Sequence, residues 1–321
     1  MTAVAGRTLN CFHRTSPESA MRILMPVDVS QYSKDAVAFV ASRATLLKHP
    51  TEVELVNLQY RVPVRAARAL GKEMVQTYYA AEAAKALKAA TDALKRAGAL
   101  TTAQFAVGTV ADDLASIVAN DRADLIVMGS HGDTGLKKLL LGSVASTVAV
   151  ACTKPLLILR GAPIPKKDSL KVGIALDGSP YGLAAVRFVA EQRDLFGAAP
   201  SVCLIHVVPD LKKITLPGWF GREVPTGIKP GQVEAMQKAA FENVFGPARV
   251  LLARAGITAT EVRLVGQVPG DAIASHATKS KLDLLAMGSL GFGASRHTFL
   301  GSVATRVALK CQTALLLVRE K

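Results

Sequence analysis

The feature that most constrains this chain is an internal repeat. The stretch ADLIVMGSHG at 123–132 matches LDLLAMGSLG at 282–291, and LLLGSVASTVAVACTKPLLILR at 139–160 matches TFLGSVATRVALKCQTALLLVR at 298–319. Both pairs are 159 residues apart. Self-similarity of this kind means that one structural unit occurs twice. The 321 residues are therefore expected to form two domains of similar fold, each long enough to bury a core.

Each copy alternates short apolar runs with helical segments. In the first copy we expect strands at 22–27, 53–58, 102–107, 124–128 and 155–159. We expect one helix after the first strand, which Ser30 or Ser33 could cap, and further helices at 72–97, 112–120 and 143–151. Continuous Val, Ile and Leu strands that alternate with helices indicate a parallel sheet covered on both faces. The predicted fold class is α/β: two tandem doubly wound, Rossmann-like α/β/α sandwich domains, each with a five-stranded parallel sheet.

The repeat also sets the expected domain boundaries. We expect a flexible N-terminal extension at 1–20, a first domain at 21–160, a linker at 161–170 and a second domain at 171–321. The second copy is ten residues longer than the first. Most of this excess falls near the loop 209–231, which contains the single tryptophan, and the sequence assigns that loop no role.

Composition argues against several classes of function. The chain has 39 Lys and Arg against 25 Asp and Glu, but this excess is spread over both halves, and aromatic residues make up only 5%. A nucleic-acid interface would favour a basic patch interleaved with aromatic residues. The longest apolar runs are too short to cross a bilayer, and the first twenty residues lack the apolar centre of a secretory signal. We expect a cytoplasmic protein that does not bind nucleic acid or enter a membrane.

The cysteines indicate neither metal nor redox chemistry. Cys11, Cys152, Cys203 and Cys311 lie far apart and form no CxxC pair. Cys152 and Cys311 occupy equivalent positions of the repeat, after a predicted helix. We expect buried free thiols.

A glycine-rich segment follows the fourth predicted strand of each copy. In the first copy Gly129 and Gly132 precede Gly142 and Ser143, with the spacing GxxG, nine residues, GS, and the second copy keeps the same spacing. Glycine lets a phosphate approach the backbone closely. Ser143 is expected to cap the helix that follows, whose free N–H groups favour an anion. By itself such a segment is also compatible with an ordinary turn.

The combination MPVDVS, MGSHGDTGLKKLLLGSVASTV and KPLLIL resembles the universal stress protein family in its tandem form. The resemblance covers both halves from residue 21 onward. Within that family the glycine spacing is the signature of the branch that binds ATP. The resemblance therefore implies ATP as the ligand, with Mg²⁺ as an optional bridge between its phosphates.

The resemblance also implies a role for each matching residue. Contacts to the nucleoside are implied for Asp28 and Asp177, and contacts to adenine for Leu58 and Val207. Positions that line the ribose side are implied for Met128, Gly129, Met287 and Gly288. The phosphates are implied to lie against Gly132, Gly142, Ser143, Gly291, Gly301 and Ser302.

Some positions depart from the family pattern. Asn57 stands where the family commonly has a histidine, which the second copy keeps as His206. Leu290 stands where the first copy has His131, the residue type that is usual in the family. Asp133 adds an acidic residue to the first phosphate loop. Asp28 and its counterpart could instead cap the following helix. His131 is interpreted as a loop residue, because spacing places no nucleophile beside it.

Three functions remain open. The leading prediction is an ATP-binding stress-response or regulatory module without assigned catalytic residues. The alternatives are a slow ATPase or adenylyl-transferring enzyme, and an interaction protein in which nucleotide is incidental. The last strand of each copy should lie at a sheet edge, where a bare apolar strand pairs readily. In the family this strand pairs across a two-fold interface, which a tandem chain can satisfy internally. We also expect a homodimer.

Overall fold

The computed structural model describes residues 21–44, 46–47, 50–132, 141–160, 168–209, 230–291 and 300–319. Its strands are β1 (Met21–Pro26), β2 (Thr51–Tyr60), β3 (Leu100–Gly108), β4 (Leu125–Gly129), β5 (Leu156–Leu159), β6 (Lys171–Leu176), β7 (Ser201–Val208), β8 (Ala259–Val265), β9 (Leu284–Gly288) and β10 (Ala314–Val318). Its helices are α1 (Gln31–Ala44), α2 (Val64–Leu70), α3 (Lys72–Arg96), α4 (Val110–Asn120), α5 (Ser143–Ala151), α6 (Pro180–Glu191), α7 (Pro230–Arg254), α8 (Pro269–Lys279) and α9 (Ser302–Lys310), with a 3-10 turn η1 (Arg193–Phe196).

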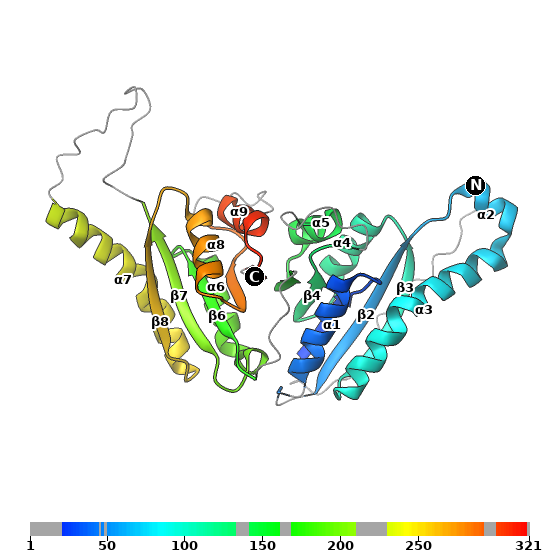
Figure 1. Ribbon diagram of the computed structural model, residues 1–321, viewed down its shortest axis with the longest axis horizontal. Coiled ribbons are helices and arrows are strands. Elements are labelled where there is room, and N and C mark those ends of the chain that lie inside the picture. Colours follow the sequence, from blue (N-terminus) through cyan, green and yellow to red (C-terminus); the bar gives the residue numbers. More distant parts are fainter. Residues whose placement is uncertain are drawn as a thin grey trace, which may run out of the picture.

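The strands form one continuous sheet whose two halves are related by the repeat. Its order is β3-β2-β1-β4-β5-β10-β9-β6-β7-β8, and all pairs within a half are parallel. The halves meet at the antiparallel pair β5 and β10, where Leu157 lies opposite Leu316. Figure 1 shows the two halves side by side with this seam between them. The predicted fold class is confirmed, and the last strands pair inside the chain.

Alternating side chains build a core on each face of the sheet. In β2, Val53 and Leu55 point toward the face covered by α1 and α3, whereas Val56 belongs to the cluster under α4 and α5. This alternation is the two-residue period of a strand. Strands covered on both faces can contain consecutive apolar residues, which explains the uninterrupted runs in β4 and β5.

The sequence predicted most elements but missed two. The helix expected at 72–97 is α3, which ends before Gly98, a residue with a φ of +84° that only glycine adopts easily. The short helix α2 and the turn η1 were not predicted. Helix α2 spans two turns and has no buried residue, so it leaves no apolar periodicity to detect.

Several predicted segments fall outside the described residues, namely 1–20, most of the linker at 161–170 and most of the loop 209–231. The end of the linker is described: Leu170 is buried, and Ser169 forms a bridge with Gly197 of the second half. The proposed domain boundaries stay a prediction. No helix in the described ranges is long and apolar enough to span a membrane.

Candidate functional site

In each half, the next two strands of the chain lie on one side of the first strand and the last two lie on its other side. This switch in strand order falls between β1 and β4 in the first half and between β6 and β9 in the second. Doubly wound sheets bind ligands at this switch, outside the carboxyl ends of the strands. Asp28 lies just beyond β1 and Gly129 ends β4, so both lie at the first switch. Asp177 and Gly288 occupy the same places at the second switch. The structure thus brings together residues that are about a hundred positions apart in the sequence.

Asp28 uses one carboxylate oxygen to organise the start of α1. Its Oδ1 accepts hydrogen bonds from the backbone N–H of Ser30 at 3.1 Å and from the Ser30 hydroxyl at 2.5 Å. The Ser30 Oγ accepts the N–H of Ser33 at 3.2 Å, which is the contact of an N-cap. The second oxygen, Oδ2, faces Gly132, where an added Cβ would lie 3.1 Å from it. Helix capping and a binding role are therefore compatible.

The second half repeats this arrangement. The Oδ1 of Asp177 accepts the N–H of Ser179 at 2.9 Å and its hydroxyl at 2.5 Å. Ser179 is the N-cap of α6 and accepts the N–H of Gly182 at 3.2 Å. The Oδ2 of Asp177 faces Gly291, only 2.6 Å from the position of an added Cβ. Each switch point therefore presents one carboxylate oxygen to the glycine loop.

Gly129 and Gly288 are glycines because a helix packs against them. A Cβ on Gly129 would lie 2.7 Å from the Cβ of Tyr32 and 2.8 Å from its carbonyl carbon. On Gly288 it would meet the carbonyl carbon of Tyr181 at 2.8 Å. Both tyrosines lie in the first turn of the helix that follows the switch-point aspartate. The close approach that the sequence attributed to a phosphate is thus already made by protein backbone at this position.

The second glycine pair holds the far end of the loop against the strand. The N–H of Gly142 donates to the carbonyl oxygen of Ser130 at 2.9 Å, and the N–H of Gly301 donates to Ser289 at 2.8 Å. A Cβ on Gly142 would lie 3.1 Å from the Ser130 oxygen and 3.3 Å from the Cα of His131. The start of α5 is therefore fixed beside the exit from β4, and α9 beside β9.

The predicted capping role of Ser143 is wrong. Gly142 is the N-cap of α5 and Ser143 its first helical residue, and Gly301 and Ser302 have the same places in α9. In the part of the chain that the structure describes, no side chain caps either helix. The first N–H groups of a helix have no acceptor within it and favour an anion. Ser143 is exposed, so its hydroxyl adds to this group of donors.

The predicted contacts to adenine and ribose come from strand ends. Leu58 and Val207 lie near the carboxyl ends of β2 and β7. Met128 and Met287 come just before the glycines that end β4 and β9. The side chains of both methionines and Val207 are buried in the core. Only their backbone is available to a ligand.

The departure at Asn57 preserves a structural contact. The Nδ2 of Asn57 donates to the carbonyl oxygen of Val27 at 2.8 Å. His206 forms the equivalent bond through Nδ1 to Leu176 at 2.7 Å. A carbonyl only accepts, so Nδ1 of His206 carries a hydrogen. Both side chains tie the second strand of a half to the end of its first strand, beside the switch-point aspartate.

The two sites also differ at His131, whose counterpart in the second half is Leu290. The ring of His131 lies 5.1 Å from the ring of Tyr32, and its Nδ1 is 2.9 Å from the Ser130 hydroxyl. These contacts agree with a loop residue that packs against α1. The residues at 133–140 and 292–299, including Asp133, lie outside the described part of the chain.

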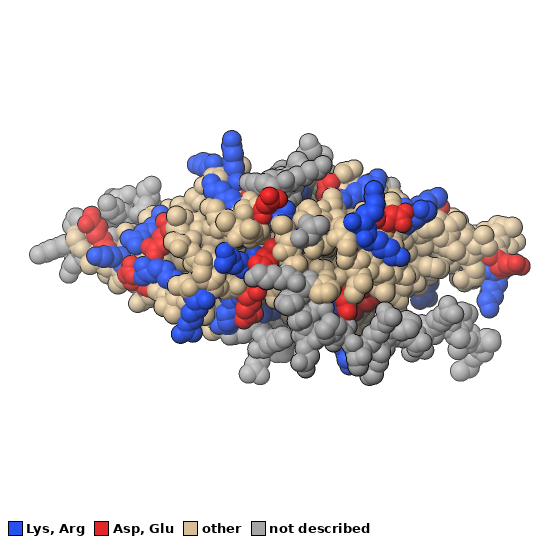
Figure 2. Space-filling model, turned by 90° about the horizontal axis from the view of Figure 1, so that it is seen from below, with Lys and Arg blue, Asp and Glu red and all other residues tan. Residues whose placement is uncertain are grey.

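The remaining titratable groups give little sign of other chemistry. Among the described residues, no group of three or more His, Cys, Asp or Glu side chains could hold a metal ion. Cys152, Cys203 and Cys311 are buried and free, and burial raises the pKa of the Cys152 and Cys203 thiols. In the face that Figure 2 presents, blue and red side chains are interspersed over both halves.

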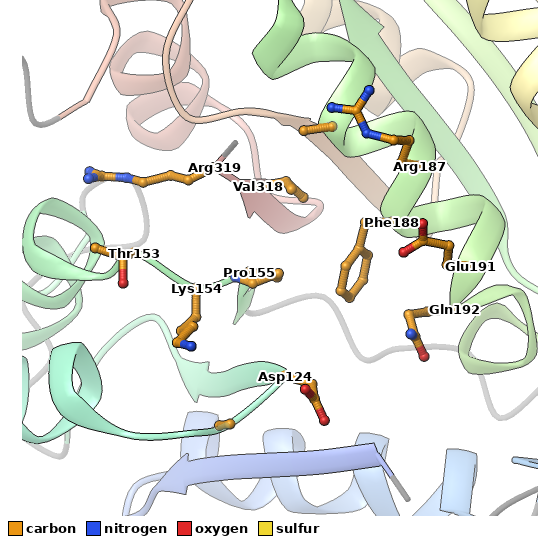
Figure 3. A pocket seen from close by; sticks show the side chains of 12 residues that line it. Asp124, Thr153, Lys154, Pro155, Arg187, Phe188, Glu191, Gln192, Val318 and Arg319 are labelled. Atoms are coloured by element: carbon orange, nitrogen blue, oxygen red, sulfur yellow. The ribbon is translucent and has the colours of Figure 1, made fainter. Parts of the chain in front are cut away.

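A cavity of ≈ 490 Å³ lies elsewhere, at the seam between the halves. Figure 3 shows Lys154 and Pro155 of the first half opposite Phe188 and Glu191 of α6. The guanidinium group of Arg319 points away toward α5. None of the predicted site residues lines this cavity.

Comparison with known proteins identifies the fold unit. The Universal stress protein family matches residues 20–160 and again 170–319. The chain belongs to the universal stress protein family. A universal stress protein of Mycolicibacterium smegmatis is 26% identical over 309 residues, which cover 93% of this chain and 97% of that protein.

Solved structures agree on the tandem fold of this universal stress protein. The crystal structure of a universal stress protein from Archaeoglobus fulgidus covers 94% of this chain and 98% of its own, with a TM-score of 0.63 and 18% identity. A universal stress protein solved in complex with cAMP aligns with 48% of this chain and all of its own, at 22% identity and a TM-score of 0.32.

Proposed function

We propose that this universal stress protein binds ATP at both switch points and acts as a nucleotide-dependent regulatory module in a stress response. The single observation that supports this most is the convergence of Asp28, Gly132 and the first turn of α5 at one switch point. The second half repeats the convergence with Asp177, Gly291 and α9.

The proposed division of roles follows the chemistry of each group. The Oδ2 of Asp28 is an acceptor suited to a ribose hydroxyl or an adenine amino group. The backbone at Leu58 would contact the base, and that at Gly129 the ribose side. Gly132, Gly142 and Ser143 would hold the phosphates, with the N–H groups of α5 as donors.

The donor set fits Mg²⁺ only as a companion of the phosphates. Mg²⁺ usually keeps several waters and binds through one or two carboxylates together with phosphate oxygens. Asp28 and Asp177 are the carboxylates that face the two glycine loops. Because both are assigned to the nucleoside, the ion would be held mainly by phosphate oxygens and water, and it would neutralise phosphate charge there.

Titration calorimetry with ATP and Mg²⁺ tests this proposal. We expect two nucleotides per chain, one in Gly142→Val, one in Gly301→Val and none in the double variant. Gly246→Ala serves as a control, because a Cβ there meets no described atom within 4 Å. Absence of binding to folded wild-type protein would reject the proposal. Phosphate release that the double variant loses would instead favour the slow ATPase.

A further inference from the structure

One segment at the outer end of the first half is exposed to an unusual degree. We call it the basic arm and define it as residues 60–78, from the end of β2 through α2 to the start of α3. Five large apolar side chains in it are exposed: Tyr60 (70%), Val64 (66%), Leu70 (48%), Met74 (58%) and Tyr78 (51%). Figure 1 shows α2 at the end of the molecule farthest from the seam.

The arm is anchored at its base. Tyr79 is buried, its hydroxyl accepts the N–H of Val62 at 2.7 Å, and its carbonyl oxygen accepts a hydrogen bond from Gln59 at 2.9 Å. In contrast, α2 has seven residues and buries none of them. Helices this short are marginal in water unless an apolar face packs against something. Its exposed side chains therefore contribute nothing to the core.

The arm also carries uncompensated positive charge. Arg61, Arg65, Arg68 and Lys72 are all exposed, against one exposed acid, Glu73. Within the described residues, no ion pair involves these four cations, whereas farther along α3 the cations at Lys85 and Lys88 are paired within the helix. The charge of the arm is thus available to a partner.

The composition of the arm resembles that of a protein interface. Tyr, Met and Arg are the residue types enriched where proteins bind proteins, and Tyr and Arg dominate binding energy there. A helix that lies on a membrane separates its apolar and basic faces. In the arm the exposed apolar side chains come from the end of β2, from α2 and from the start of α3, and not from one face of a single helix.

We propose that the basic arm is a docking surface for another protein that presents acidic side chains among apolar ones. Acidic groups would pair with the arginines, and apolar side chains would cover Val64, Leu70 and Met74. A second copy of the chain fits poorly, because two arms would bring like charges together. This proposal is independent of nucleotide binding.

Photo-crosslinking in the native cells tests the proposal. A benzoylphenylalanine placed at Leu70 should capture a protein that the same group at Val250 of α7, also exposed, does not capture. The captured protein is then purified, and its binding to the full chain is measured at low and high salt. We expect affinity to fall with salt.

Charge reversal decides whether the arm is responsible. The double variant Arg65→Glu with Arg68→Glu should bind at least about tenfold more weakly, because like charges that meet at an interface cost several kcal/mol. Lys238→Glu with Lys279→Glu changes the net charge equally in the second half and should keep wild-type affinity. Both pairs are exposed, so circular dichroism should show that each double variant is folded.

Four results would overturn the proposal: capture of a second copy of the chain, capture of lipid alone, no capture beyond that at Val250, or a captured protein whose affinity is unchanged by the reversal at Arg65 and Arg68.

Discussion

Arg160 of the first half donates hydrogen bonds to the carbonyl oxygens of Ala308 and Cys311 at the end of α9 in the second half. Arg319 makes the reciprocal contact, donating to Val150 of α5 at 3.0 Å. Each arginine follows the last strand of its own half and crosses the seam. A cation at the carboxyl end of a helix is favourable for the helix dipole, so these contacts join the halves beyond the pairing of β5 with β10.

Replacing Arg160 should weaken the seam. It is buried, burial lowers the pKa of its guanidinium, and two buried carbonyl oxygens accept its hydrogen bonds. We expect Arg160→Met to lower the free energy of unfolding by about 1–3 kcal/mol, the cost of leaving buried acceptors unpaired. Arg160→Lys should retain only part of this stability, because an ammonium group cannot donate two hydrogen bonds in the forked geometry of a guanidinium. Urea denaturation measures both, and equal midpoints in all three proteins would refute the role.

The contact between Gly129 and Tyr32 predicts a difference between glycines of one loop. Gly129→Ala should destabilise the protein by about 1–3 kcal/mol, because the new methyl group overlaps the backbone of α1. Gly132→Ala should cost little stability, since among the described residues a Cβ there approaches only the Asp28 carboxylate. Thermal denaturation of the two variants compares them directly. Equal melting temperatures would show that the packing of α1 does not require a glycine at 129.

The ion pairs of Asp271 predict a pH-dependent contribution to folding stability that the equivalent position of the first half does not make. Arg306 and Lys310 donate to its carboxylate and hold its pKa well below the usual 3.8. A carboxylate whose pKa is lower in the folded than in the unfolded state stabilises the fold at pH values above its unfolded pKa. This stability is lost as the pH falls toward the folded-state pKa. Asp271→Asn should therefore lower the urea midpoint near neutral pH, and the difference should shrink in acid.

The first half contains the matched control for this prediction. Asp112 is the third residue of α4 as Asp271 is of α8, but Thr147 and Ala151 stand where α9 has the two cations. Asp112→Asn should leave the urea midpoint almost unchanged at both pH values. An equal loss in both variants would mean that the helix dipole, and not the cation pair, is responsible.

The equivalence of Asn57 and His206 predicts that one can replace the other. Asn57→His should keep near wild-type stability if its Nδ1–H reaches the carbonyl oxygen of Val27, as His206 reaches Leu176. Asn57→Ala should lose about 1–3 kcal/mol, because it leaves that carbonyl without its donor. Chemical denaturation of the two variants measures the difference. A loss in Asn57→His as large as in Asn57→Ala would contradict the equivalence.

The sequence by itself was sufficient for the repeat, the α/β class and most of the elements. Those features depend on local patterns, such as continuous apolar runs in β4 and the alanine-rich helix α3. The glycine spacing also marked the loops that the structure places at the two switch points. The short helix α2 escaped because it has no buried face.

Tertiary structure decided what each marked residue does. Gly129 is small because Tyr32 packs on it, Gly142 rather than Ser143 begins α5, and Asp28 divides its oxygens between Ser30 and the glycine loop. It also joined β5 to β10, so the strands expected at two edges became the centre of one sheet. These outcomes depend on contacts between residues far apart in the chain, and the period of a local sequence carries no record of such contacts.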